Sequence, residues 1–343
     1  MSLSSSTSEV AAVAGPGRRP GASRRRALTR QIALRLAMVV PVVLGVITLI
    51  FLVGALSHRD PARSALGPTA SAEQREAFAK ANGLDDPLPV RYVRYLGDVA
   101  RGDLSVTLVT QEPIWDLVKR AAPVTISLTL LASGLALLLG LVLGVLSALH
   151  RNSLFDRAAL VVASVGHAVP AFLVGLIVIQ LFAVKWHVIP SGGYVPLADG
   201  VGEWLRCLIG PALTLALPFG AVMARVIRGT MVQELEKEYV RTAQGLGLSV
   251  RTIVLRNVLR NALAAPLTQF GVGMGVLFSG AILIESLFQL PGLGMLTVQG
   301  IQNGDFGLVS AVGIFGGLAF VIVNAVIDVI CALLDPRGSV TAS

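Results

Sequence analysis

The sequence predicts an all-α integral membrane protein with six transmembrane helices, and this prediction follows from its composition and from the length of its apolar runs. Of the 343 residues, 54% are hydrophobic and only 14% are charged, and the mean hydropathy is +0.75. A soluble domain carries about a quarter charged residues. An apolar run of about 20 residues crosses a bilayer core of about 30 Å, and within lipid such a run satisfies its backbone hydrogen bonds as a helix.

Six apolar runs are long enough to span a membrane and are nearly free of charged residues. In chain order, the predicted spans are Leu36–Leu56, Ala122–Leu149, Ala158–Val184, Pro211–Arg228, Ala264–Ile284 and Leu308–Leu334. Pro170 and Pro218 lie within the third and fourth runs. Proline removes a backbone donor from a helix, so a kink is predicted at each of these positions.

The segment before the first span, residues 1–30, is rich in Ser, Ala, Gly, Pro and Arg and is predicted to be a disordered basic tail. Residues 23–28, Ser-Arg-Arg-Arg-Ala-Leu, loosely resemble a twin-arginine export signal. The apolar run that follows is longer than the apolar region of a signal peptide, which is about 7–15 residues. A retained first span is therefore favoured over a cleaved signal.

The distribution of Lys and Arg predicts that both termini are cytoplasmic. With the N-terminus inside, basic residues gather beside the inner ends of the spans, and the two short outer loops hold only Lys185 and Arg206. The first outer loop, residues 57–120, is longer than about 60 residues, and the charge rule carries little weight for loops of that size. The connection between the fourth and fifth spans, residues 229–263, is then cytoplasmic.

The long outer loop, residues 57–120, contains the signals of a small helical insert. The tetrapeptide SAEQ at residues 71–74 predicts a capping box at the start of a helix, and NG at residues 82–83 predicts its end. A second amphipathic stretch follows at Val90–Leu96. The insert either caps the outer face of the protein or forms a docking surface for a soluble partner.

The sequence lacks the motifs of an enzyme that works alone. It contains no G-x-x-x-x-G-K-[ST] phosphate loop, no H-E-x-x-H, no G-x-S-x-G and no cluster of His and Cys. We therefore predict no catalytic residue, no cofactor and no metal site. Cys207 and Cys331 are expected to pack as small apolar residues. The net charge of +8 is attributed to membrane topology, not to nucleic-acid binding.

A carrier that is driven by an ion gradient usually places ionisable residues within its spans. The candidates in this sequence are His167 and Asp328. The ordinary interpretation is that His167 forms a hydrogen bond with a neighbouring helix. Asp328 is ordinarily interpreted as a residue at a helix end near the inner membrane surface. The chain thus has the features of a membrane path without an energy source of its own, and the energy is expected to come through contact with another protein.

The cytoplasmic connection begins with a dense patch of charge, formed by Glu234, Glu236, Lys237, Glu238 and Arg241. Apolar residues at helical spacing beside it predict a short amphipathic helix whose apolar face consists of Val240, Ala243, Leu246 and Val250. Gly245 and Gly247 favour a short helix that ends in a tight turn, because glycine costs about 1 kcal/mol relative to alanine within a helix. Such a helix could lie on lipid, form a solvated linker or press against a partner protein.

Two segments of this connection carry a resemblance to a known family: Glu238–Ser249 (EYVRTAQGLGLS) and Leu259–Leu263 (LRNAL). Together they resemble the EAA loop of binding-protein-dependent ABC importers, in the form found in the B-type permease of the dipeptide/oligopeptide/nickel family. Gly245 and Leu246 stand where that family usually has Ala and Lys, and Gly102–Thr107 also departs from the usual pattern. Further similar segments occur in family order within residues 30–338, at Gly67–Ala70, Gly83–Tyr92, Pro190–Tyr194, Pro211–Leu215, Glu285–Gly294 and Leu333–Arg337.

The resemblance implies that residues 31–338 form half of a pore with type I ABC importer architecture in the bacterial plasma (inner) membrane. The implied partners are a second homologous permease subunit, two ABC ATPase subunits that hydrolyse ATP, an extracytoplasmic substrate-binding protein and a peptide substrate. The lipid bilayer surrounds the complex, and no nucleic acid is involved. The chain itself would be a non-catalytic subunit that switches between inward-open and outward-open states.

The resemblance also implies two sets of functional residues. Coupling to an ATPase is implied for Glu238, Tyr239, Arg241, Thr242, Ala243, Gly247, Leu259 and Asn261. An extracytoplasmic gate or docking segment beneath the binding protein is implied for Glu285, Pro291, Gly292, Gly294 and Asp305. The alternative for the second set is an ordinary surface loop.

The substrate implied by the resemblance is a dipeptide or oligopeptide. Small polar residues in the spans could line the path or serve in helix packing, and these are Thr125, Ser133, Ser164, Gln180, Thr214, Gln269 and Ser279. An importer of nickel or of a metallophore is the alternative within the family, although no Met/His cluster lines the spans. An ion-coupled secondary transporter and a structural scaffold are the alternatives from other classes.

Overall fold

The computed structural model describes residues 40–334, except 42, 57–61, 63–65, 68, 82, 103–105 and 108–109. Over these residues the secondary structure is helical, apart from one bridge between Val106 and Pro113. The predicted basic tail, the start of the first span and the motif at Asp335–Arg337 lie outside the described residues, as does the side chain of Asp328.

Where the structure describes them, the predicted apolar runs lie in helices, with a break at Val169 and Pro170 in the third run. The first span corresponds to an apolar helix at Val43–Leu56. The others correspond to α5 (Ile114–Leu149), the bent series α6 (Leu154–Ala168), α7 (Ala171–Val178) and the π-helical η1 (Ile179–Lys185), then α8 (Val201–Leu235), α12 (Ala264–Leu287) and α14 (Phe306–Leu334). By length and composition, α5, α8 and α12 each qualify as a membrane span among the described residues, and the bent series is a candidate fourth.

The third run is broken where the sequence predicts a kink. α6 and the helix that follows it differ in direction by 101° across Pro170. Pro170 removes a backbone donor, and it keeps Val169 extended, at φ −77° and ψ 126°, because a residue before proline avoids the helical region. The fourth run is not broken at its proline: α8 continues as one helix through both Pro211 and Pro218.

Shorter helices connect the long ones. The outer insert contains α3 (Ala72–Ala81) and α4 (Leu88–Arg101). The backbone N–H of Ser71 donates to Gln74 Oε1 at 2.9 Å and that of Gln74 donates to Ser71 Oγ at 3.2 Å, which confirms the predicted capping box. The remaining short elements are η2 (Leu197–Asp199), α9 (Glu238–Gly245), α10 (Val250–Ile253), the π-helical η3 (Val254–Val258), α11 (Leu259–Ala262) and α13 (Leu293–Asn303).

Glycine allows α5 and α8 to approach each other closely. A Cβ atom at Gly144 of α5 would lie 2.8 Å from the carbonyl oxygen of Ala224 in α8, and one at Gly140 would meet the Cβ of Met223. Such close packing of small residues is a common source of helix association in lipid. The two helices therefore form a tightly packed pair along which the other helices are arranged.

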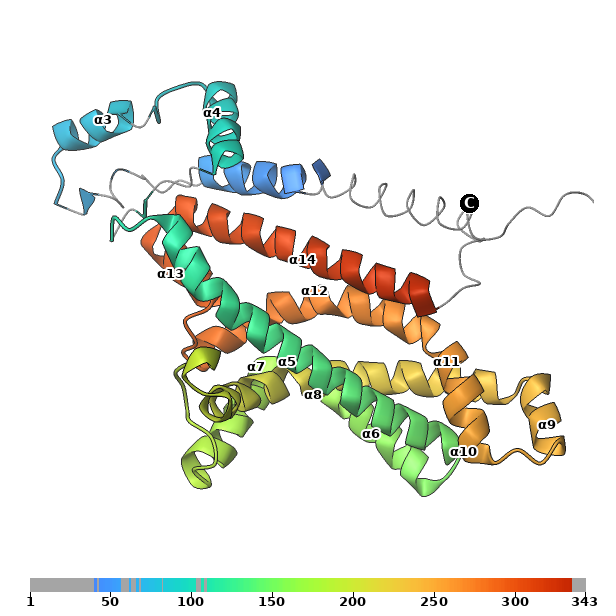
Figure 1. Cartoon of the computed structure of the whole chain (residues 1–343). Coiled ribbons are helices and arrows are strands. Elements are labelled where there is room, and N and C mark those ends of the chain that lie inside the picture. The colour runs from blue at the N-terminus through green and yellow to red at the C-terminus, as the bar shows by residue number, and fades with distance from the viewer. Residues whose placement is uncertain are drawn as a thin grey trace, which may run out of the picture.

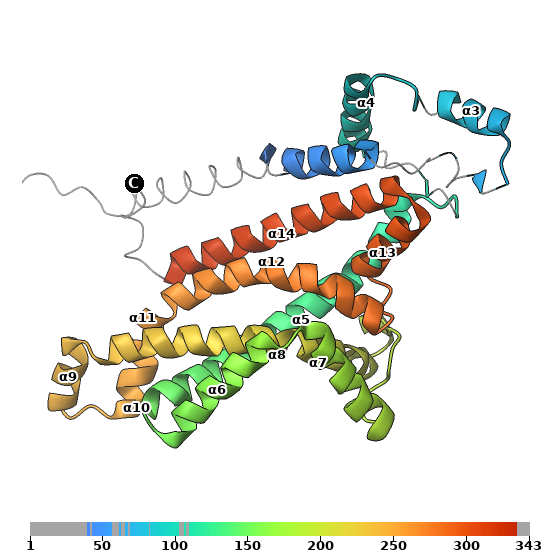
Figure 2. The same ribbon diagram turned by 180° about the vertical axis from the view of Figure 1, so that it is seen from behind.

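Figures 1 and 2 show that the two segments singled out by the sequence lie at opposite ends of this helical body. The elements α9, α10 and α11 lie at one end, beside the turn that joins α5 to α6. The insert helices α3 and α4 lie at the other end, together with α13. We call the first end the coupling end and the second the outer end, after the predicted topology.

Candidate functional site

At the coupling end, α9 is attached to the body of the protein through its apolar face. Val240 and Ala243 are buried in a cluster that includes Met231 of α8, Ile253 of α10 and Val258 of η3. The predicted coupling residues Glu238, Arg241 and Thr242 are exposed on the other face of α9. The helix thus has an exposed polar face, while its position relative to α8 is fixed by packing.

A polar group reinforces this attachment. The hydroxyl of Tyr239 donates to Glu234 Oε1 at 3.0 Å, and Glu234, which is buried at the end of α8, also forms an ion pair with Lys237 at 2.5 Å. Asn261 of α11 lies near both Tyr239 and Glu234. Burial raises the pKa of the Tyr239 hydroxyl above its usual value, and the nearby Asn261 side chain opposes that rise. The structure therefore brings Tyr239 and Asn261 together around Glu234.

The turn after α9 has a backbone conformation that suits glycine. Gly247 has φ +79°, and its N–H donates to the carbonyl of Gln244 at 2.9 Å. A residue with a Cβ is strained at such a φ, although the space around Gly247 is open within this chain. This agrees with the predicted short helix and tight turn.

The prediction that Leu246 and Val250 share the buried face of Val240 and Ala243 is wrong. Leu246 is 77% exposed and Val250 is 58% exposed. The helix ends at Gly245, and the chain reverses at Gly247, so the helical spacing does not continue past that point. Leu246, Leu248 and Val250, which follow α9 directly in the chain, are instead exposed, and we call these three residues the apolar edge. Leu259 is half-buried and packs against the cluster beneath α9.

At the outer end, Glu285 is fully buried, with an exposed fraction of 0%. Its Oε1 accepts a hydrogen bond from the Thr125 hydroxyl at 2.6 Å, and its Oε2 accepts from the N–H groups of Gly294 at 2.7 Å and Met295 at 3.3 Å. Thr125 Oγ1 in turn accepts from the N–H of Leu293 at 2.8 Å. The side chains of α5 and α12 thus satisfy the free backbone donors at the start of α13.

The two glycines of this segment make room for the carboxylate. A Cβ atom at either Gly292 or Gly294 would collide with the Glu285 carboxylate, and one at Gly294 would also collide with the backbone of Ile282. Pro291, by contrast, is exposed at the turn before α13. The structure therefore joins Glu285, Gly292 and Gly294 in one packed unit.

Asp305 lies apart from that unit, at the other end of α13. It is only 3% exposed, and its Oδ1 accepts a hydrogen bond at 3.0 Å from the N–H of Leu308 in the first turn of α14. Both acids of the predicted gate segment therefore point into the protein. The exposed surface of the segment is formed by other side chains, among them Gln289, Gln299, Gln302 and Asn303.

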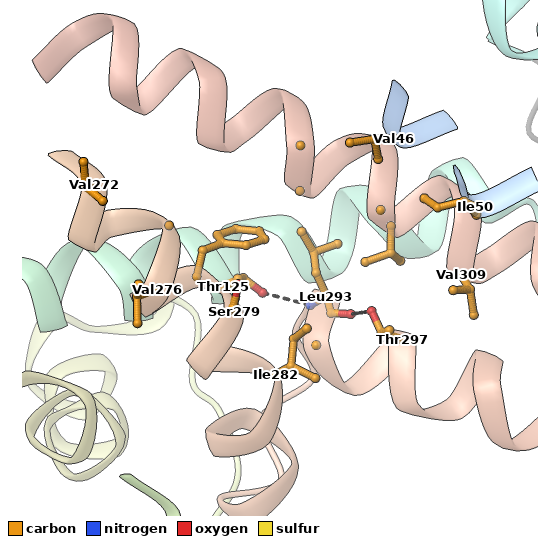
Figure 3. Close-up of a pocket in the computed structure, with 17 residues that line it drawn as sticks. Val46, Ile50, Thr125, Val272, Val276, Ser279, Ile282, Leu293, Thr297 and Val309 are labelled. Carbon is orange, nitrogen blue, oxygen red and sulfur yellow. Dashed lines mark hydrogen bonds between the residues drawn. The ribbon is translucent and has the colours of Figure 1, made fainter. Parts of the chain in front are cut away.

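A pocket of about 720 Å³ lies beside the Glu285 unit, between the helix Val43–Leu56 and helices α12, α13 and α14 (Figure 3). Its walls are mostly apolar, with hydroxyl groups from Thr125, Ser279 and Thr297. Two of the small polar residues considered for the path, Thr125 and Ser279, thus line a cavity. Two others, Ser133 and Thr214, are buried and donate to carbonyls of their own helices, which is a packing role.

One partly buried ion pair at the coupling end was not predicted. Arg228 of α8 forms two hydrogen bonds with Asp156 of α6, at 2.6 and 2.7 Å. The pattern Ser153-x-x-Asp156 was an available signal, because Ser153 Oγ accepts from the N–H of Asp156 as a helix cap. Its pairing with an arginine 72 residues away has no local signal. Among the residues that the structure describes, no group of three or more His, Cys, Asp or Glu side chains could hold a metal ion.

Two family models match the chain. The model described as "Binding-protein-dependent transport system inner membrane component" matches residues 140–340. The corresponding N-terminal model of such membrane components matches residues 26–129.

Three curated proteins that are similar to this chain are named as permease proteins of transport systems. A probable peptide ABC transporter permease protein of Sinorhizobium fredii is 34% identical over 303 residues, covering 88% of this chain and 97% of that protein. A probable D,D-dipeptide transport system permease of Escherichia coli is 37% identical over 317 residues, covering 86% and 93%. A glutathione transport system permease of Pectobacterium atrosepticum is 34% identical over 302 residues, covering 88% and 96%.

The fold is also similar to that of a solved structure. A chain of the MetNI methionine ABC transporter, in an inward-facing conformation, aligns with a TM-score of 0.52 at 16% sequence identity. The alignment covers 65% of this chain and 99% of the MetNI chain. At this level of identity the likeness concerns the fold alone.

Proposed function

The chain belongs to the family of binding-protein-dependent transport system inner membrane components, and on that premise we propose that it forms one half of the pore of a bacterial peptide importer. Members of this family are non-catalytic membrane subunits of ABC transporters, and they work with an ATPase and a binding protein. The observation that carries the proposal is the identity of 34–37% to peptide and dipeptide permeases over nearly the whole chain.

The proposed assembly contains this chain, a second homologous permease, two ATPase subunits and an extracytoplasmic binding protein. Six spans and cytoplasmic termini are part of the proposal. The distribution of basic residues supports this topology, because residues 229–263 are rich in Arg while the two short loops at the other end hold only Lys185 and Arg206. The separation of α9 and α13 to opposite ends of the body supports it as well (Figure 1).

We assign the contact with the ATPase to α9 and the turn that follows it. The exposed polar face of α9, with Glu238 and Arg241, lies next to the apolar edge formed by Leu246, Leu248 and Val250. An exposed apolar edge flanked by charge has the composition of a protein interface, with an apolar centre and a polar rim. ATP binding that closes the two ATPases would then move α9 and shift the permease between two states.

The proposed substrate class is short peptides. The relatives named above are peptide, D,D-dipeptide and glutathione permeases, and glutathione is itself a small peptide. Among the described residues that line the pocket beside Glu285, there are hydroxyl groups and apolar side chains and no charged side chain. Such a lining would hold no single substrate side chain tightly, so selection among peptides is assigned to the binding protein.

A transport assay tests the proposal. The complex that co-purifies with the tagged chain is placed in liposomes, and uptake of labelled dipeptides and oligopeptides is measured with the binding protein and ATP. We expect uptake that requires both. Uptake by the chain alone under a proton or sodium gradient would replace the importer with a secondary carrier. ATP-driven uptake of a nickel chelate without any peptide uptake would keep the importer and overturn the substrate class.

A further inference from the structure

We propose that the ion pair between Asp156 and Arg228 transmits the movement of α9 to the hairpin formed by α5 and α6, an inference that rests on the proposed importer function. Asp156 and Arg228 would then be positioning residues of the transport cycle. They lie outside the loop to which we assign the contact with the ATPase, and neither lines the pocket beside Glu285.

The pair has the geometry of a strong cross-link between two helices. Arg228 Nε donates to Asp156 Oδ1 at 2.6 Å, and Arg228 Nη2 donates to Oδ2 at 2.7 Å. The Asp156 side chain is 2% exposed, and that of Arg228 is 21% exposed. Charge-assisted pairs with two parallel bonds fix relative orientation as well as distance, so α6 and α8 are held in one arrangement at this point.

The carboxylate of Asp156 also joins both arms of the hairpin. Ser147 near the end of α5 donates its hydroxyl to Oδ1 at 2.5 Å, and the backbone N–H of Asn152 in the turn donates to Oδ2 at 2.9 Å. Asp156 itself lies in the first turn of α6. One side chain therefore connects α5, the turn and α6 to a single arginine of α8.

The same stretch of α8 continues to the attachment of α9. Glu234, which accepts the hydrogen bond from Tyr239, lies six residues beyond Arg228, a distance of about 9 Å along a helix. Ala148 of α5 and Met231 of α8 belong to the same buried cluster as Val240 of α9. A displacement of α9 is thus carried by a continuous segment of helix to Arg228 and from there to the hairpin.

A purely structural role is the alternative to this proposal. Replacing a buried ion pair by neutral residues of similar size is often neutral for stability, whereas removing one partner leaves an uncompensated charge. Neutralising both partners therefore separates the two roles. In the variant Asp156→Asn with Arg228→Met, the amide oxygen can still accept from the N–H of Asn152, and the amide NH2 can donate to the Ser147 hydroxyl. The contacts within the hairpin are thus kept, but the bond to α8 is removed.

The experiment compares four forms of the assembled complex in liposomes: wild type, Asp156→Asn, the double variant and Arg157→Gln. Arg157 is an exposed residue next to Asp156, so its replacement controls for loss of one positive charge at this surface. Peptide uptake and ATP hydrolysis are measured per assembled complex, together with thermal unfolding. ATP-driven uptake by the wild type establishes the proposed function independently of the variants.

We expect the double variant to recover the unfolding temperature that Asp156→Asn loses, while the peptide imported per ATP stays about 2- to 30-fold below wild type, the range for substitutions within a coupling network. Arg157→Gln should equal the wild type. Wild-type coupling in the double variant would overturn the proposal, as would an equal defect in Arg157→Gln. If the double variant does not assemble, Arg228→Lys takes its place, because it keeps the positive charge but loses the pair of parallel hydrogen bonds to Asp156. Wild-type coupling in Arg228→Lys would also count against the proposal.

Discussion

Replacing Glu285 by alanine should release the start of α13 from the body of the protein. The carboxylate accepts from the N–H groups of Gly294 and Met295 and from the Thr125 hydroxyl, all in a fully buried site. Without the carboxylate, the Thr125 hydroxyl can turn to a backbone carbonyl of its own helix. The N–H groups of Gly294 and Met295 lie in the first turn of α13, where a helix offers them no carbonyl partner. A buried donor left unsatisfied costs about 1–3 kcal/mol, so we expect a local loss of about 3 kcal/mol.

Hydrogen exchange measures this loss directly, because exchange rates report the free energy of local opening. A loss of about 3 kcal/mol corresponds to exchange about 100-fold faster, since 1.4 kcal/mol is a factor of ten. The amides to follow are those in the first two turns of α13 (Leu293–Asn303). Glu285→Gln keeps one oxygen for the two backbone donors, so its free energy of local opening should fall by only about 1 kcal/mol.

The control is Glu76→Gln, which breaks an exposed ion pair with Lys80 on α3. Such pairs contribute about 0–1 kcal/mol, and α13 should exchange as in the wild type. Unchanged exchange of α13 in Glu285→Ala would refute the assignment of Glu285 as the anchor. So would a glutamine variant that exchanges as fast as the alanine variant, because the number of acceptors would then not matter.

Three further predictions concern the coupling end. Gly247→Val should reduce peptide uptake per ATP hydrolysed, because a β-branched residue at φ +79° costs at least about 1–2 kcal/mol and displaces the turn, whereas Gly247→Asn should be milder; equal activity in both variants would count against this. Alanine at both Glu238 and Arg241 should weaken co-purification of the ATPase without changing thermal stability, since both are exposed; unchanged co-purification would remove them from the interface. Tyr239→Phe should lower the free energy of unfolding by about 1 kcal/mol, as measured by chemical denaturation, through loss of its bond to Glu234; an unchanged value would mean that this bond contributes no net stability.

The existence and order of the long helices could be predicted because each apolar run reflects the lipid that surrounds it. Their ends could not be predicted so well. α5 begins at Ile114, eight residues before the predicted Ala122, and α8 extends beyond Pro211–Arg228 at both ends. Hydropathy marks the part of a helix that lies in lipid, whereas the helix itself continues while its backbone bonds and side-chain contacts persist.

The contacts that define the two ends could not be predicted from the sequence. Thr125 and Glu285 are 160 residues apart, and Asp156 and Arg228 are 72 apart, so no local pattern connects them. Only the family resemblance predicted a role for Tyr239 and Asn261, and the structure adds that both lie beside Glu234. The spacing rule failed at Leu246 because it assumes a helix that continues, and glycine ended that helix.

Helix α5 physically connects the two ends. Ser147, which binds Asp156, and Thr125, which binds Glu285, lie on this one helix, and 22 residues of helix span about 33 Å. Pro123 precedes both positions, so the segment between them has no proline and its backbone hydrogen bonds are unbroken by that residue. Gly140 and Gly144 pack this same segment against α8. In the proposed mechanism, a shift that Arg228 imposes on the hairpin reaches the anchor of α13 through this one helix. That route from the proposed ATPase contact to the proposed gate does not require a chain of side-chain rearrangements across the membrane.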